Sequence, residues 1–239
     1  MTRRPHWSGE LLVLVGLLVV YDRVAGLAKV RADEAYAHGR DLLELSPAGL
    51  EKAANLWLAG VGWLYDPFAY YYDLAHIDVT LVVFLLCWFL RPGVYRQART
   101  SLVVINLIAL GIVLLYPVAP PRLLPSADFV DIVALSGTWG SGGAVADRAN
   151  EFGAMPSLHL AWAVWVALTV WTMTESRWWR GLGWVHVALT GAVTVYTGNH
   201  YLLDLLAGAL LAAAAWAGTA QVRQRWGRTA TSQVAASTS

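Results

Sequence analysis

The residues best suited to chemistry are His200 and Asp204, which lie four positions apart at the start of a long apolar run. If residues 202–217 form a helix, the two side chains share one face, about one turn apart. A carboxylate in that position holds an imidazole in one tautomer and stabilises its cation, which makes the ring a better nucleophile or base. The alternative is a buried pair that only ties helices together, and the pair alone does not separate the two roles.

A second histidine, His159, follows Pro156 and Ser157 at the start of another apolar run. We expect Pro156 to be the first helical residue, because its missing N–H costs nothing there. The free N–H groups of that turn suit a phosphate oxygen, and Ser157 adds a hydroxyl donor. His159 falls within the first turn, where it could give a proton to a leaving group. A lone histidine would be read as interfacial, but a partner at the depth of His200 favours catalysis.

Three further residues complete the candidate site as substrate-binding groups. Arg122 follows a stiff, proline-rich segment at the end of an apolar run, and its planar fork of donors suits phosphate. By itself such an arginine is more often a lipid-headgroup anchor. Asn199 is expected to cap the last helix, and His76 lies at the outer end of an apolar run at the same depth.

The composition places these residues in a membrane protein. The chain is 57% hydrophobic and 14% charged, whereas an average soluble domain carries about 25% charged residues. The formal net charge of +1 argues against a nucleic-acid partner. Cys87 is alone in the middle of an apolar run, which excludes disulfides and thiolate metal sites. We find no metal-ligand motif and expect no metal and no cofactor.

The apolar runs predict an all-α membrane protein, a bundle of six transmembrane helices with no separate linker. The first transmembrane helix occupies residues 1–28, and residues 29–75 form interfacial helices that break at 65–67. A catalytic transmembrane core spans residues 76–220, and residues 221–239 form a disordered cytoplasmic tail. An interfacial helix is also expected in the outer loop, 118–156. The six spans are expected at 11–27, 76–90, 101–116, 158–173, 182–195 and 202–217.

The short arginine-rich loops predict the orientation, because basic loops stay on the cytoplasmic side. Both termini are then cytoplasmic in a multi-pass protein of the cell membrane. Arg122, His159 and His200 all fall at the outer ends of their spans. Three distant parts of the chain therefore converge on one depth at the extracytoplasmic side.

With these features in place, three segments resemble the signature blocks of the type-2 phosphatidic acid phosphatase superfamily, in the branch of the inositol phosphorylceramide synthases. The segments are residues 119–122, 156–159 and 200–204, and the resemblance extends over roughly residues 65 to 220. It implies that His200 attacks phosphorus and carries a phosphohistidine, while Asp204 orients it. His159 would protonate the departing oxygen and then activate water or an acceptor hydroxyl.

The same resemblance implies that Arg122, Ser157 and the first-turn amides hold the phosphoryl oxygens, without a metal. The chain departs from the pattern where two phosphate-binding cations are usual, at Leu115 and at Val193-Thr194. Arg148 is a candidate replacement. Fewer fixed charges suit a phosphodiester or a transferase substrate better than a dianionic monoester.

The implied function is a lipid-phosphate phosphatase or phosphotransferase acting on a membrane lipid phosphate or phospholipid. Water or an alcohol can release the phosphoenzyme, so hydrolase and transferase are not separated, and the oligomeric state is left open. The rival reading is a proton-coupled transporter in which both histidines and Asp204 form a relay. That reading expects ionisable groups near mid-membrane, whereas these cluster at one surface.

Overall fold

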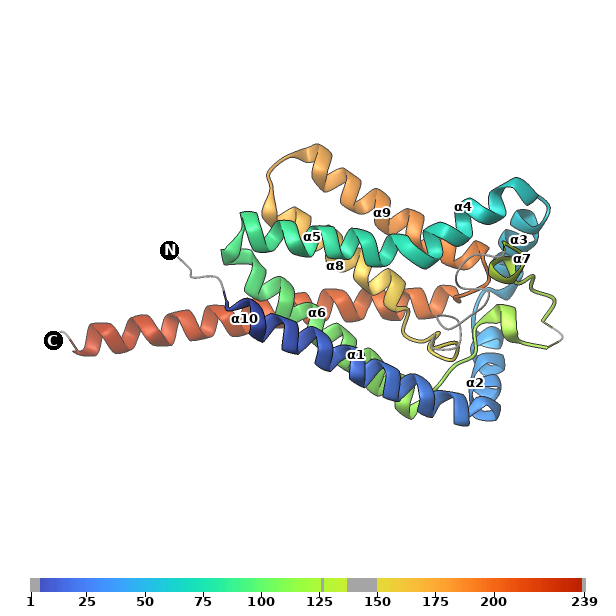
Figure 1. The fold of residues 1–239 in the computed structure, drawn as a ribbon, viewed down its shortest axis with the longest axis horizontal. Helices are drawn as coiled ribbons and strands as arrows, with labels where there is room; N and C mark the ends of the chain where they lie inside the picture. The colour runs from blue at the N-terminus through green and yellow to red at the C-terminus, as the bar shows by residue number, and fades with distance from the viewer. Residues whose placement is uncertain (1–4, 126, 137–149, 238–239) are drawn as a thin grey trace.

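The computed structural model describes residues 5–125, 127–136 and 150–237, and side chains to residue 222. These residues are helical wherever they are regular, and Val118 and Gly153 form an isolated β-bridge. The expected all-α class is confirmed for this part of the chain. The long helices run alongside one another (Figure 1): α1 Trp7–Val30, α5 His76–Leu90, α6 Pro92–Leu115, α8 Leu158–Met173, α9 Arg177–Tyr196 and α10 Leu202–Ser237.

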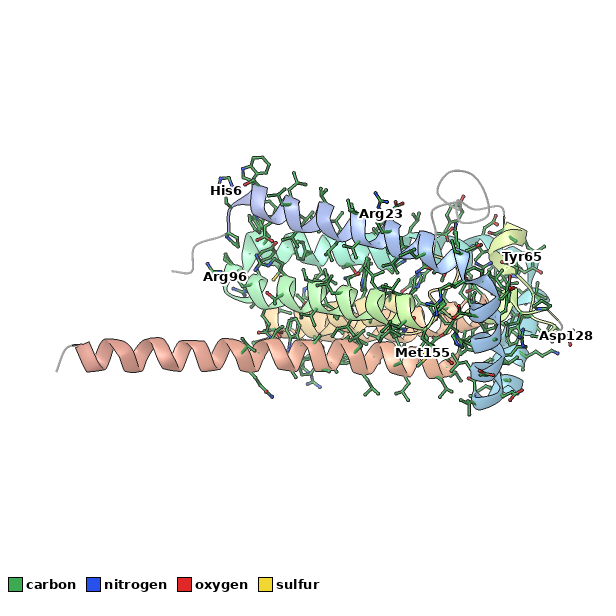
Figure 2. The ribbon with its side chains drawn as sticks, turned by 90° about the horizontal axis from the view of Figure 1, so that it is seen from below. His6, Arg23, Tyr65, Arg96, Asp128 and Met155 are labelled. Atoms are coloured by element: carbon green, nitrogen blue, oxygen red, sulfur yellow. The ribbon has the colours of Figure 1, made fainter. Side chains whose placement is uncertain are left out.

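Shorter helices lie across one end of this bundle, which we call the site end (Figure 1). They are α2 Ala32–Leu45, α3 Ala48–Ala59 and α7 Ile132–Ser136. The start of α1 and the far end of α10 lie at the opposite end. Figure 2 shows the same two ends of the bundle from another direction, with Tyr65 and Asp128 at the site end and His6 and Arg96 at the opposite end.

Four helices among the described residues are long and apolar enough to cross a membrane. They are Trp7–Val30, Gly62–Leu90, Pro92–Leu115 and Leu202–Val222. Helix α8 is apolar but only 16 residues long, and α9 is not among the four. Large apolar side chains along α1 and α5, such as Leu12, Leu18 and Phe89, are exposed, as expected of helices that face hydrocarbon.

The helical stretch that contains α5 begins before residue 76, where the sequence predicted the second span to start. Helix α3 ends at Ala59, and a continuous helical stretch then runs through α4 (Tyr65–Tyr70) and a π-helical turn (Tyr71–Ala75) into α5. We expected the break at residues 65–67. Pro67 instead lies in the first turn of α4, where a missing N–H leaves no hydrogen bond unmade.

The other end of the chain also differs from expectation. Helix α10 continues to Ser237 and so runs through most of the segment, 221–239, that we expected to be a disordered tail. Alanine, glutamine and arginine in this stretch have high intrinsic helix propensity and favour the extension.

Helix α8 is the centre of the bundle and packs against α5, α6, α9 and α10. Trp165 of α8 is fully buried, and its indole N–H donates to the carbonyl of Ala98, 2.8 Å away. At the end of α6 that lies away from the site end, Glu10 of α1 accepts hydrogen bonds from the Tyr95 hydroxyl at 2.8 Å and from Arg99 at 2.5 Å. These bonds tie α1 to the core.

Candidate active site

The loop that carries His200 makes a tight turn between α9 and α10. Gly198 has φ +71°, and a Cβ there would lie 3.2 Å from the Cβ of Arg122. The amides of Asn199 and His200 both donate to the Thr194 carbonyl, at 3.0 and 3.2 Å. The turn thus folds back on the last residues of α9, and it fixes His200 just before α10 begins.

The hydrogen bonds of His200 determine which of its ring nitrogens carries the proton. Its Nδ1 lies 3.1 Å from Asp204 Oδ1 and 3.1 Å from the Ala154 carbonyl. Since both neighbours are acceptors, Nδ1 carries the proton and Nε2 keeps its lone pair. The other Asp204 oxygen accepts from the Tyr201 amide at 3.0 Å, which is half of a capping box at the start of α10. Asp204 therefore orients the ring and caps the helix.

His159 faces the free nitrogen of His200. Its Nδ1 lies 3.2 Å from His200 Nε2. His159 is the second residue of α8, in the first turn as expected. The expectation for Pro156 was wrong: Ser157 is the N-cap, its hydroxyl oxygen accepts from the Leu160 amide at 3.3 Å, and Pro156 precedes it. Serine provides the acceptor that a helix start needs, so the helix begins after it.

Helices α8 and α10 meet closely enough to fix this pair. The Ser157 amide donates to the Asp204 carbonyl at 3.1 Å. A Cβ on Gly208 would lie 2.3 Å from the Ser157 carbonyl oxygen, so only glycine allows this approach. The start of α8, with His159, is thereby held against the first turns of α10.

The two imidazoles touch directly. A separation of 3.2 Å is a hydrogen bond, which leaves no space for a phosphorus atom between the nitrogens. The roles that the resemblance implies for His200 and His159 need a phosphoryl group between the two rings. A phosphoryl group reaches His200 Nε2 only when the two rings part.

His76 packs against His159 rather than against His200. The ring centroids of His76 and His159 are 4.1 Å apart, and the ring of Tyr72 stacks on His159 at 4.4 Å. His76 Nδ1 donates to the Tyr72 carbonyl at 3.0 Å. Substrate binding by His76 stays a prediction, and its observed contact is with the ring of His159, which faces His200. We missed Tyr72, although its four-residue spacing from His76 places both on one helix face.

Arg122 lies beside the His200 loop, as the sequence suggested, but two of its guanidinium nitrogens already donate to protein side chains. Its amide donates to the Gly198 carbonyl at 2.9 Å. Its Nε donates to Asn199 Oδ1 at 2.7 Å and its Nη1 to Asp131 Oδ2 at 2.5 Å. The ion pair with Asp131 was not foreseen.

Asn199 does not cap α10, contrary to expectation. Besides accepting from Arg122, its side chain donates to the Thr197 hydroxyl at 2.8 Å. The helix begins three residues later, at Leu202, and that amide donates to Glu51 Oε1 at 2.6 Å. Asn199 instead links Arg122 to the turn.

Two buried polar residues of α3, Glu51 and Asn55, were overlooked because this segment was treated as interfacial. Glu51 binds the start of α10 and also accepts from the Ser46 hydroxyl. Asn55 donates to the carbonyls of Tyr196 and Val130 at 2.9 and 3.0 Å. Both side chains are fully buried. Their spacing of four residues was the available signal, since it places two polar groups on one helix face.

Tyr201 joins the loop to the proline-rich segment. Its hydroxyl donates to the Ala119 carbonyl at 2.8 Å. Burial raises the pKa of the Tyr201 phenol, and the charges of Asp204 and Glu51 add to that shift, so the donor stays protonated. Gly39 of α2 makes room for this contact, because a Cβ there would lie 2.7 Å from the Ala119 oxygen.

No cluster of three metal-ligating side chains occurs among the residues that the structure describes. Arg148, the candidate replacement cation, lies outside the described residues. Metal independence therefore stays a prediction.

Residues 48–218 match the family model of the PAP2 superfamily, and the chain belongs to that superfamily. It is 28% identical over 184 residues to the phosphoinositol dihydroceramide synthase of Bacteroides thetaiotaomicron, a match that covers 65% of this chain and 60% of that protein. The crystal structure of Aquifex aeolicus LpxE has a similar fold, with a TM-score of 0.55 and 16% identity over 72% of this chain and 93% of that one. The resemblance stated from the sequence is confirmed.

Proposed function

We propose that this chain is an integral membrane enzyme that transfers the phosphoryl group of a lipid phosphate through a phosphohistidine on His200. One observation carries the proposal. The Nδ1 atom of His200 is held by Asp204 and the Ala154 carbonyl, which leaves Nε2 as a nucleophile that faces His159. Membership of the PAP2 superfamily supports an enzyme of the phosphatase or phosphotransferase kind.

In the first step, the lone pair of His200 Nε2 attacks phosphorus and the bond from phosphorus to the leaving oxygen breaks. Protonated His159 gives that oxygen its proton. Asp204 stabilises the positive charge on the His200 ring. In the second step, His159 removes a proton from water or an alcohol, whose oxygen attacks phosphorus as the bond to Nε2 breaks. His159 is then protonated again for the next cycle.

The phosphoryl oxygens have donors close to both histidines. The free amides at the start of α8 carry the positive end of the helix dipole. The Ser157 hydroxyl uses its oxygen to accept from Leu160, which leaves its O–H able to donate. Arg122 supplies the positive charge, and Asn199 orients its guanidinium.

We further propose that the bundle crosses the cell membrane six times, with both termini cytoplasmic and the site end outside. The long apolar helices and the position of α2 and α3 across one end support this arrangement. Asp128 is 74% and Glu175 94% exposed, which suits labelling of the corresponding cysteine variants. In intact cells, a membrane-impermeant maleimide should label Asp128→Cys and spare Glu175→Cys. The reverse pattern would invert the topology.

For the lipid substrate and the acceptor, we base a proposal on the name of the relative. The curated relative is named as a phosphoinositol dihydroceramide synthase, and the match covers 60% of its length. That name supports a transferase that moves a phospho-headgroup onto a lipid alcohol. Water in place of the alcohol would release the headgroup phosphate from a phosphodiester, and inorganic phosphate from a phosphomonoester.

The test is a screen of lipid phosphates and phospholipids with the purified protein in detergent, with and without EDTA. The wild-type protein should release or transfer the phosphoryl group at the same rate with and without EDTA. Mass analysis should find a phosphoryl group on His200. His200→Ala should be inactive. The control is His186→Ala, because His186 lies in α9 and bonds the Tyr71 hydroxyl instead. Activity that survives His200→Ala would refute the proposal.

A further inference from the structure

The guanidinium expected to bind phosphate is already paired with a carboxylate of the protein. Arg122 donates to Asp131 at 2.5 Å and to Asn199 at 2.7 Å. The side chains of the ion pair are only 14% and 25% exposed. Because the pair is partly buried, salt screens it less than a surface pair, and the local charge sums to zero.

Asp131 is fixed in this position from both sides. Its second oxygen accepts from the Ala134 amide at 3.0 Å, at the start of α7. The preceding residue, Val130, is held by Asn55, which accepts from its amide at 2.7 Å and donates to its carbonyl at 3.0 Å. The carboxylate therefore stays beside Arg122 unless this anchored segment moves.

The other basic side chain near this segment is neutralised in the same way. Lys52 of α3 donates to Asp128 at 2.8 Å. Within the described parts of α3 and of residues 117–136, Lys52 and Arg122 are the basic residues, and both pair with carboxylates of one loop.

We propose that Asp131 is a specificity-determining residue that makes the site favour the monoanionic phosphate of a phosphodiester over the dianionic phosphate of a monoester. Any phosphate that approaches Arg122 also approaches Asp131, and repulsion grows with the charge of the phosphate. A diester brings one negative charge and a monoester nearly two. This inference rests on the proposed function, because it takes Arg122 as the phosphate-binding group.

Asp131→Asn is the informative variant. The amide oxygen can still accept from Arg122 or Ala134, and asparagine is a good N-cap, so the charge changes while the fold is kept. Asp128→Asn is the matched control, since it removes the same charge from the same loop at a solvent-exposed pair. The kcat/KM of phosphatidic acid relative to phosphatidylinositol should rise about tenfold in Asp131→Asn, the size expected from removing one nearby charge. It should not change in Asp128→Asn.

A binding measurement makes the inference independent of turnover. Phenylphosphonate and its monomethyl ester are titrated at mildly alkaline pH, where they carry two charges and one. Asp131→Asn should tighten binding of the dianion about tenfold more than that of the monoanion. An unchanged ratio, equal loss of both ligands, the same shift in Asp128→Asn, or no phosphonate binding by wild type would overturn the role of Asp131. If wild type turns over no lipid phosphate, the proposed function fails, while the phosphonate ratio still decides the inference.

Discussion

The Nε2 atom of His200 lies 3.2 Å from the Nδ1 atom of His159, although 41 positions separate the two residues in the chain. The contact joins the start of α8 to the loop before α10. It is short enough to be a hydrogen bond, so the same two rings that face each other must separate to admit a phosphoryl group.

Asp204→Asn should lower kcat by about 10³- to 10⁴-fold, by analogy with the loss of an orienting carboxylate in other His-dependent sites. The amide oxygen can still accept from the Tyr201 N–H, but the group no longer stabilises a charged imidazole. Steady-state turnover and the melting temperature in detergent are the measurements. A variant that keeps wild-type kcat would show that Asp204 only caps α10.

His159→Gln should slow the second step more than the first when the substrate has a good leaving group. Such a group departs without a proton, whereas release of the phosphoenzyme still needs a base. With p-nitrophenyl phosphate, a phosphoryl group on His200 should therefore accumulate and appear by mass analysis. With a p-nitrophenyl diester, the adduct on His200 should keep the second ester group and have the correspondingly higher mass. No accumulation, together with a normal turnover rate, would remove His159 from the mechanism.

Gly208→Ala should lower activity by about 10²-fold, because a misplacement of about 1 Å at reacting groups has an effect of that size. The new Cβ would lie 2.3 Å from the Ser157 carbonyl oxygen and push the start of α8 away from α10. Gly218→Ala is the control within the same helix, because a Cβ there meets nothing within 4 Å. Equal activity of the two variants would contradict the close packing.

Asn55→Ala should lower the free energy of unfolding by about 1–3 kcal/mol or more, since it leaves buried backbone groups without partners. The affected groups belong to Val130 and Tyr196. Asn106→Ala is the comparison, because Asn106 bonds one carbonyl of its own helix and is less buried. Thermal unfolding in detergent measures both variants. A smaller loss for Asn55 than for Asn106 would show that α3 does not hold the site.

Much of the site could be predicted from the sequence because its signals are local. Residues 158–173 were expected to be helical and are α8, since they form an unbroken apolar run, although the start of the helix was expected at Pro156. The proximity of His200 and Asp204 followed from their spacing at a helix start. The apolar runs also predicted that Arg122, His159 and the His200 loop come together, and they do: His159 contacts His200, and Arg122 contacts Asn199.

The sequence by itself determined an all-helical, apolar chain, the family and the residues that meet at one end. The tertiary structure decided the partners of those residues. Asp131 pairs with Arg122, and Tyr72 and His76 pack on His159. Glu51 and Asn55 bind the two ends of the turn that carries His200. Sequence patterns report which face of an element is apolar, because burial is periodic along a helix. They do not report which polar group from a distant segment meets a given donor, since that depends on how the helices pack.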